Sequence, residues 1–324
     1  MAKKNQISLA NVISVVGVVS LGVLTYLGQV LLSGGAIGTS IIWAVGVAVV
    51  AAALLIVMIR AKGAESHFGM WKIVEGITLV LYAVVAIFTA SMSVHFFVVT
   101  GNKEELKKEA KQDIEAIEGL YNEFIENRYD AIDNTIVSVR TYNSNGSEEK
   151  QTESDVLDNL KAEGLIYSDK IDLSDIDEFE AILERAVVEP VELKWEDNLK
   201  ENLKKWNAQI ENWSLFYLPG IAAEMSEYYD ELKLSLAEHA GDTKLWTLDG
   251  DGNIAEDDQV YEPSDYTMKF GDMLKSATGD TVIGWVVIAV IHIMIIFNYV
   301  VAYRSPTTMI GGKRRRRDDG GISL

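Results

Sequence analysis

The chain has 324 residues, a mean hydropathy of +0.10 and a formal net charge of −19, an unusual combination for one uniform water-soluble domain. The charge is segregated: residues 101–280 hold 44 of the 48 acidic and 18 of the 29 basic residues, a net charge of −26, and the rest of the chain carries +7. The chain has no cysteine, which excludes disulfides, thiolate metal sites and a cysteine nucleophile.

Four apolar stretches are long enough to cross a bilayer as helices, which takes about 20 residues. They run approximately over residues 7–32, 36–59, 73–99 and 282–303. The first is too long for the core of a signal peptide, so we expect it to be retained as a span. The uncharged sequence Ser33-Gly34-Gly35 predicts a short turn into the second span. The sequence therefore predicts an all-α polytopic membrane protein. A large, mostly helical domain, which can include a small β-hairpin, lies between spans three and four.

Small residues predict close packing of the first two spans. Span two has alanines at four-residue spacing, and span one has a similar stripe of small side chains. Such stripes let helix backbones approach each other, which is how spans associate in lipid. We therefore expect spans one and two to form a tight hairpin. The stripes are Ala44, Ala48 and Ala52 in span two, and Ala10, Ser14 and Gly17 in span one.

Basic residues beside the spans indicate the orientation of the chain, because cytoplasmic loops carry an excess of Lys and Arg. They lie before span one, between spans two and three, and after span four. Four crossings put all three groups on the same side of the membrane. We therefore expect both termini in the cytoplasm and residues 101–280 outside it. The three groups are Lys3 and Lys4; Arg60, Lys62 and Lys72; and Arg304 with the run from Lys313 to Arg317.

These spans divide the chain into a membrane part (residues 1–100), an acidic extracytoplasmic helical domain (101–280), a fourth span (281–303) and a basic tail (304–324). An external domain of this size without cysteine suits the bacterial periplasm, because extracellular proteins of animals commonly carry disulfides. We expect a multi-pass protein of a bacterial inner membrane, with residues 101–280 periplasmic or extracellular.

The basic tail has two interpretations. It is either a topology anchor attracted to anionic membrane lipids or a docking segment for a cytoplasmic partner. Two aspartates follow the arginines, which argues against nucleic acid as the partner. The arginines are Arg314, Arg315, Arg316 and Arg317.

A long amphipathic helix is predicted after span three. Apolar residues recur every three or four positions from Ile114 to Val139, and charged residues fill the other face. If this helix continues span three with only a kink at Gly101, it extends over about 65 residues, or close to 100 Å. The polar stretch 142–151 predicts a loop. Two capping boxes then predict shorter helices. They are Thr152 with Asp155, and Ser174 with Asp177.

A coiled-coil-like seam follows Pro190. Six residues alternate steps of four and three along a predicted helix. The dipeptide Pro219-Gly220 breaks the rhythm, which then resumes from Ile221 to Leu236. Two tryptophans at this spacing could line a ligand cage, but packing in a helical core or against a partner's helices explains them better. The seam residues are Leu199, Leu203, Trp206, Ile210, Trp213 and Tyr217.

Residues 245–261 interrupt the helical pattern. The Asp249-Gly250 pair between two apolar segments predicts a β-hairpin. The same residues partly match a calcium-binding loop, in which Asp249, Asp251, Asn253 and Asp258 would supply the oxygen ligands. The match lacks the usual acidic first ligand and the final glutamate, so an acidic turn is the simpler interpretation.

Ionisable residues inside the spans are candidate functional groups, because their burial without a partner is costly. Glu75 lies near the cytoplasmic end of span three, where it can reach the headgroups. His292 lies about 15 Å and His95 about 6 Å below the outer edge, so the two histidines are poorly placed to pair directly. His292 either serves transport or sensing or hydrogen-bonds to a neighbouring span. Asn11 and Asn298 are expected to hydrogen-bond between spans.

The chain has no phosphate-binding glycine loop, nucleophile elbow or zinc-protease motif, so we expect no enzyme and no cofactor. The favoured function is a scaffold or assembly subunit of a multiprotein envelope complex, which binds other membrane or envelope proteins or itself. One alternative is an extracytoplasmic sensor that signals through spans three and four to a cytoplasmic partner. Another is a channel or carrier subunit that uses His292 and Glu75.

Overall fold

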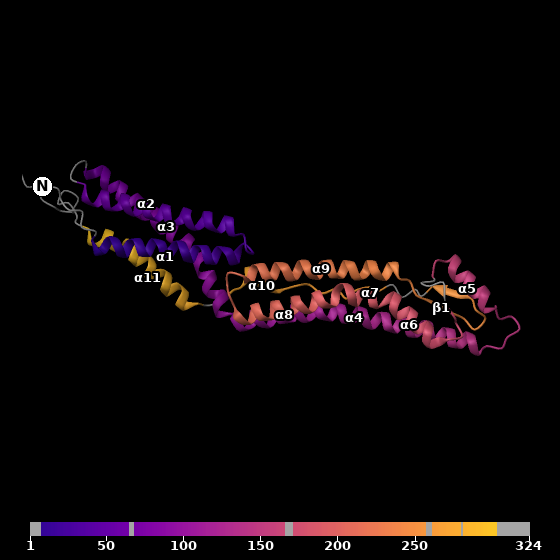
Figure 1. Ribbon diagram of the computed structural model, residues 1–324. Helices are drawn as coiled ribbons and strands as arrows, with labels where there is room; N and C mark the ends of the chain where they lie inside the picture. The colour runs from indigo at the N-terminus through magenta and orange to yellow at the C-terminus, as the bar shows by residue number, and fades with distance from the viewer. Residues whose placement is uncertain (1–7, 65–67, 166–170, 257–260, 280, 303–324) are drawn as a thin grey trace, which may run out of the picture. The chain divides into compact units, whose positions relative to one another are not determined.

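The computed structural model describes residues 8–64, 68–165, 171–256, 261–279 and 281–302. The described chain is mostly helical. Three long apolar helices precede a helical region with a two-stranded sheet, and a fourth follows it (Figure 1). The predicted fold class is therefore confirmed. The chain divides into two compact units. The membrane unit comprises the residues up to 106, 215–219 and those from 271 onward; the acidic unit comprises 107–214 and 220–270.

The four long helices of the membrane unit are long and apolar enough to cross a bilayer. They are α1 (Leu9–Leu32), α2 (Ile37–Gly63), α3 (Phe68–Gly101) and α11 (Val282–Val301). Both α2 and α3 extend past the apolar limits read from the sequence, because backbone hydrogen bonding continues through the charged residues beside a span. The Ser8 hydroxyl caps α1 by accepting a hydrogen bond from the backbone N–H of Asn11 (3.3 Å).

Glycines of α1 allow three neighbouring helices to approach it closely. A Cβ atom on Gly28 would lie 1.9 Å from the Met92 carbonyl oxygen of α3. On Gly17 it would lie 2.9 Å from the Ile295 side chain of α11, and on Gly22 it would lie 3.5 Å from α2. Small residues therefore set these helix contacts.

Spans one and two pack against each other as expected, but the stripe of small residues in span one lies against α11 instead of α2. Ser14 donates its hydroxyl hydrogen to the Met294 carbonyl oxygen of α11 (3.1 Å), and Gly17 packs on the same helix. Gly22 is instead the glycine of α1 that adjoins Ala44 and Ala48 of α2. A stripe of small side chains shows which face permits close approach, but it does not specify the neighbour.

The acidic unit is built around α4 (Lys103–Ser144), of which Lys103–Leu106 belong to the membrane unit. Two short helices follow, α5 (Glu153–Ala162) and α6 (Ile176–Val187), and then α7 (Glu189–Val191) with a π-helical turn (Glu192–Glu196). The two longer helices are α8 (Asp197–Asn212) and α9 (Leu218–Asp242), and the last is α10 (Phe270–Ser276). Strand β1 (Trp246–Leu248) pairs antiparallel with β2 (Ile254–Glu256), which is the predicted hairpin.

Two details of helix initiation differ from the sequence prediction. The capping box of Thr152 and Asp155 is present, but α6 is capped by Asp175 instead of Ser174. The Ser174 hydroxyl donates to Asp172 (2.5 Å), which leaves the Asp175 carboxylate to accept from the Glu178 N–H (3.1 Å). Pro190 and Pro219 each lie in the first turn of a helix, α7 and α9. They begin these helices, because a first-turn residue needs no N–H donor.

The acidic unit has a helical core, one part of which surrounds the hairpin. There the fully buried Trp246 stacks against Phe179 of α6 at 5.7 Å between ring centroids. Its indole N–H donates to the Leu165 carbonyl (3.1 Å), and its own carbonyl accepts the Thr135 hydroxyl of α4 (2.8 Å). Elsewhere in the unit, ion pairs join α8 to its neighbours α4 and α9. The loop predicted from residue 142 begins only after Ser144, where α4 ends.

Candidate functional site

The middle of the membrane unit contains a hydrogen-bonded pair from two spans. The hydroxyl oxygen of Tyr82 on α3 lies 3.0 Å from His292 Nδ1 on α11, and the rings meet edge to face. His292 Nε2 is buried and has no hydrogen-bond partner among the residues that the structure describes. His292 therefore bonds to a neighbouring span through one ring nitrogen, and no described protein group bonds to the other.

A second polar cluster surrounds the last turns of α11. The Tyr299 hydroxyl donates to the Glu75 carboxylate of α3. The Lys62 ammonium of α2 donates to the carbonyl oxygens of Tyr299 (2.6 Å) and Val300 (2.9 Å). Lys62 and Glu75 are both buried. Glu75 does not reach outward as we expected, because α3 begins at Phe68 and places it two turns inside the helix.

Each cluster includes one residue of a polar stripe on α3, Tyr82 in the first and Glu75 in the second. The five members of the stripe share one helix face and are all buried. From Glu75 to Ser93 the stripe covers 19 residues, about 27 Å along the helix, which is close to the thickness of the hydrocarbon core. Sequence reasoning singled out only the first member; the seven-residue spacing of three members was the signal that could have found the others. The members are Glu75, Thr78, Tyr82, Thr89 and Ser93.

Hydroxyl groups of this stripe are satisfied locally. Thr78 donates to the Val74 carbonyl of its own helix (2.7 Å), and the Ser93 hydroxyl lies 3.5 Å from that of Thr25 on α1. Such bonds hold spans together and need no ligand. The stripe is therefore a packing surface along most of its length. Beside it, among the described residues, Nε2 of His292, the α11 partner of Tyr82, has unused hydrogen-bonding capacity.

The C-terminal end of α3 is hydrogen-bonded to the segment that leads into α11. His95 Nε2 lies 2.8 Å from the Leu274 carbonyl oxygen, and the Asn102 amide donates to the Thr278 carbonyl (3.0 Å). Asn102 alone separates α3 from α4, and helical hydrogen bonds continue across it: its N–H donates to Val98 (2.9 Å), and its carbonyl accepts from Leu106 (3.0 Å). His95 and His292 thus have separate partners.

Asn11 and Asn298 meet between α1 and α11. The Asn298 amide donates to the Asn11 carbonyl oxygen (2.5 Å), and its backbone N–H donates to the Ser14 hydroxyl (3.2 Å). These bonds join the first and fourth spans.

The seam of α8 is buried in the acidic unit up to the end of the helix. Trp206 is fully buried, and its ring meets Tyr228 of α9 edge to face at 5.4 Å; Leu203 is half-buried. Tyr217, in contrast, is 67% exposed and lies outside the seam. A heptad pattern holds only within a continuous helix, and α8 ends at Asn212. The other buried seam residues are Leu199, Ile210 and Trp213.

The hairpin turn uses its carboxylate internally. Asp249 accepts hydrogen bonds from the backbone N–H groups of Asp251 and Asn253 (both 2.9 Å) and from the Asn253 side chain (2.8 Å). These bonds, the Asn253 side chain first, hold the pKa of Asp249 below its ordinary value. Among the described residues no group of three His, Asp or Glu side chains is arranged to hold a metal ion. The fourth calcium candidate, Asp258, lies outside the described residues.

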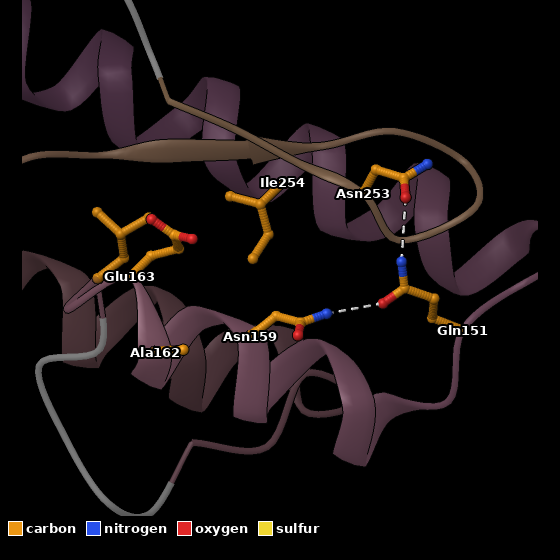
Figure 2. Close-up of a pocket in the computed structure, with 7 residues that line it drawn as sticks. Gln151, Asn159, Ala162, Glu163, Asn253 and Ile254 are labelled. Atoms are coloured by element: carbon orange, nitrogen blue, oxygen red, sulfur yellow. Dashed lines mark hydrogen bonds between the residues drawn. The ribbon is translucent and has the colours of Figure 1, made fainter.

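A surface pocket lies between the hairpin and α5. Figure 2 shows a chain of carboxamides across it: Asn159 donates to the Gln151 side chain (3.0 Å), and Gln151 donates to Asn253 (3.0 Å). Because these amides bond largely to one another, they connect the hairpin to α5 and have little hydrogen-bonding capacity left for a ligand. The remaining lining residues are Ala162, Glu163, Leu165 and Ile254.

The tail arginines Arg314, Arg315, Arg316 and Arg317 lie outside the described residues. Comparison of the chain with protein-family models, curated protein sequences and solved structures finds no match in any of the three. The function has to be inferred from the chain's own residues.

Proposed function

We propose that this protein is a non-enzymatic membrane subunit that presents its acidic unit to partner proteins outside the cytoplasm. One exposed site on that unit carries the proposal. Leu193, in the π-helical turn, is 85% exposed. Partial burial, and then the charges of Glu192 and Glu184, raise the pKa of Tyr129 on α4, which is 40% exposed, so the residue next to Leu193 in sequence lies near an exposed aromatic ring. Such a site suits a partner that combines an apolar contact with basic side chains.

The strong negative charge of residues 101–280 supports the same function. A net charge of −26 keeps a helical body soluble and attracts basic partners over a distance set by the ionic strength. We therefore expect association with the partner to weaken as salt is raised.

Co-purification of the full-length chain from mild detergent, followed by mass spectrometry, tests this function. We expect the wild-type chain to migrate as a discrete complex. Leu193→Arg should release the partner without lowering the melting temperature, and the matched variant Leu193→Met should retain it. A wild-type chain that purifies as a lone monomer would contradict the proposal.

The proposed orientation places both termini in the cytoplasm of a bacterial cell and the acidic unit in the periplasm. Arg60 and Lys62 in the last turn of α2 support it, because basic residues favour the cytoplasmic side. A reporter enzyme that works only in the cytoplasm should be active when it is fused after Leu324, and one that works only in the periplasm should be inactive there. Activity restricted to the periplasm would overturn this orientation.

A second candidate function is a sensor that transmits movement of the acidic unit through α3 and α11. The contacts from His95 to Leu274 and from Asn102 to Thr278 favour it, because they join the two chain segments that connect the spans to the acidic unit. A movement of either segment is then shared by the other.

An insertion distinguishes the sensor from a simple tether. Four flexible residues after Gly101 interrupt the helical connection, and the same insertion after Gly146, in the loop beyond α4, is the control. The readout is the labelling rate of Met70→Cys, at the opposite end of α3, with and without a nanobody raised against residues 107–270. If the protein is a sensor, the nanobody should change the labelling rate of Met70→Cys. The insertion after Gly101 should abolish this change, and the insertion after Gly146 should preserve it. An effect that survives both insertions, or no effect in the parent chain, would contradict it.

A further inference from the structure

The turn between α8 and α9 differs in composition from the rest of the acidic region. Residues 212–223 contain no charged side chain, which makes them the longest such stretch within residues 101–280. Trp213 closes α8 in a left-handed conformation (φ 48°, ψ 50°), with its N–H directed at the carbonyls of Gln209 and Ile210. The chain then turns and exposes two aromatic rings, Phe216 at 56% and Tyr217 at 67%.

This turn belongs to the membrane unit. Residues 215–219 group with the long apolar helices, and the Phe216 ring lies 6.4 Å from the ring of Tyr26 on α1. Tyr26 precedes Leu32, the last residue of α1, by six positions, which places it about 9 Å inside the helix end. Phe216 therefore lies beside the span itself. Lipid-facing residues of α1 such as Val23, which is 52% exposed, continue the same apolar surface.

We propose that the turn Leu215–Pro219 inserts into the bilayer interface, where Phe216 and Tyr217 anchor the α8–α9 hairpin to lipid. Aromatic residues concentrate at the boundary between headgroups and acyl chains, where an amphipathic ring has its apolar body in hydrocarbon and its polar end in water. The turn has this chemistry, with Phe216 against the span and the Tyr217 hydroxyl able to reach the headgroups.

A phospholipid surface explains the turn better than another protein would. The exposed Phe216 ring adjoins Tyr26 of α1, a helix whose exposed apolar side chains a bilayer must cover, so lipid is the expected neighbour of this surface. The absence of charge over twelve residues removes the cost of bringing this part of an acidic region to the membrane. The turn then forms a third attachment of residues 101–280, in addition to their covalent links to α3 and α11.

Because the chain has no cysteine, a single introduced cysteine can carry a spin label without background. The test uses the full-length chain reconstituted in phosphatidylethanolamine–phosphatidylglycerol bilayers, with Tyr217→Cys as the probe. Val23→Cys on α1 is the control for a lipid-facing position. Leu193→Cys, on an 85% exposed residue of the acidic unit, is the control for water. Collision of the label with oxygen, which concentrates in lipid, is compared with collision with a water-soluble nickel complex.

The proposal predicts an oxygen-to-nickel collision ratio at position 217 that is below the ratio at position 23, which lies deeper along α1, and several-fold above that at position 193. A ratio equal to that at position 193 would mean that the turn lies in water and would overturn the proposal. Protection from both reagents would mean that protein covers the turn, which would also overturn it. Phe216→Cys repeats the measurement at the neighbouring ring and should give the same result.

Discussion

The buried carboxylate of Asp113 on α4 accepts a hydrogen bond from the backbone N–H of Phe270, the first residue of α10, at 2.9 Å. The same carboxylate accepts from the Lys269 N–H (3.1 Å) and from the Tyr266 hydroxyl (2.8 Å). A side chain of one helix thus accepts hydrogen bonds from backbone N–H groups at the start of another. The first N–H groups of a helix need such acceptors, because they have no partner within their own helix. Asp113 thereby fixes the segment that returns from the hairpin.

Replacement of Asp113 should destabilise the acidic unit. Asp113→Ala leaves the buried N–H of Phe270 without an acceptor, at a cost of about 1–3 kcal/mol, and also removes the acceptor of the N–H of the exposed Lys269. Asp133→Ala, an exposed aspartate on the same helix, is the control and should change the free energy of unfolding by less than about 0.5 kcal/mol. Thermal unfolding of the full-length chain in detergent compares them. Equal melting temperatures for the two variants would show that the Asp113 bonds contribute nothing.

Trp206 should behave as a core residue of the acidic unit. Because its side chain is fully buried, Trp206→Ala is expected to cost about 3–5 kcal/mol. The control Leu234→Ala removes a large apolar side chain that is exposed on α9, and it should leave stability nearly unchanged. Denaturant unfolding monitored at the acidic unit measures both variants. Loss of complex size without loss of stability in Trp206→Ala would instead place this tryptophan in an interface.

The ion pair between α4 and α8 should make stability depend on pH in the acid range. Hydrogen bonds and charge attraction from Lys111 and Lys107 hold the pKa of Glu211 at about 2, below its ordinary value of 4.5. A carboxylate with a lowered folded-state pKa stabilises the fold above its unfolded-state pKa, and this contribution is lost as the pH falls through about 2. Glu211→Gln removes it.

Melting temperatures of the wild-type chain and Glu211→Gln between pH 6 and pH 2 measure this contribution. The difference between the two chains should be constant at the upper end of the range and should shrink as the pH falls below 4.5, the ordinary value for the group. Glu201→Gln, an exposed position on the same helix, should follow the wild-type curve. A difference that does not change with pH would contradict the assigned pKa.

A methyl group at Gly28 should separate α1 from α3. The added Cβ would lie 1.9 Å from the Met92 carbonyl oxygen, and a backbone atom cannot move aside by a change of rotamer. Gly28→Ala is therefore expected to lower the free energy of unfolding by about 1–3 kcal/mol or more, the range typical of overpacking. Gly46→Ala in α2 is the matched control, because nothing lies within 4 Å of its added Cβ. Titration with a denaturing detergent measures the two variants, and equal stability would refute the close contact.

The sequence predicted those features that depend on local patterns. The spans follow from apolar length, the start of α5 from the spacing of Thr152 and Asp155, and the hairpin from Asp249-Gly250 between apolar segments. Contacts between elements that are distant in the sequence could not be predicted from such local patterns. Ser14 was recognised as a small residue, but its partner helix α11 is distant in the sequence.

The polar residues show the same limit. Asp113 was hidden among 44 acidic residues of its region, although its place between Ala110 and Ile117 on an apolar face was a usable signal. His292 was identified because it is ionisable, whereas its partner Tyr82 is ordinary in a span and only its contact gives it importance. Tyr217 fitted a heptad by number but not by structure, because the helix had already ended.

The position of α1 among the spans has a consequence for the order of assembly. This helix packs against α2, α3 and α11, but α11 is synthesised only after the whole acidic unit. Until then the Asn11 amide and the Ser14 hydroxyl lack their partner Asn298, and unpaired polar groups in hydrocarbon are costly. A nascent chain that stalls before α11 therefore carries an exposed polar edge in the bilayer. We expect membrane quality control to recognise that edge as the mark of an unfinished molecule.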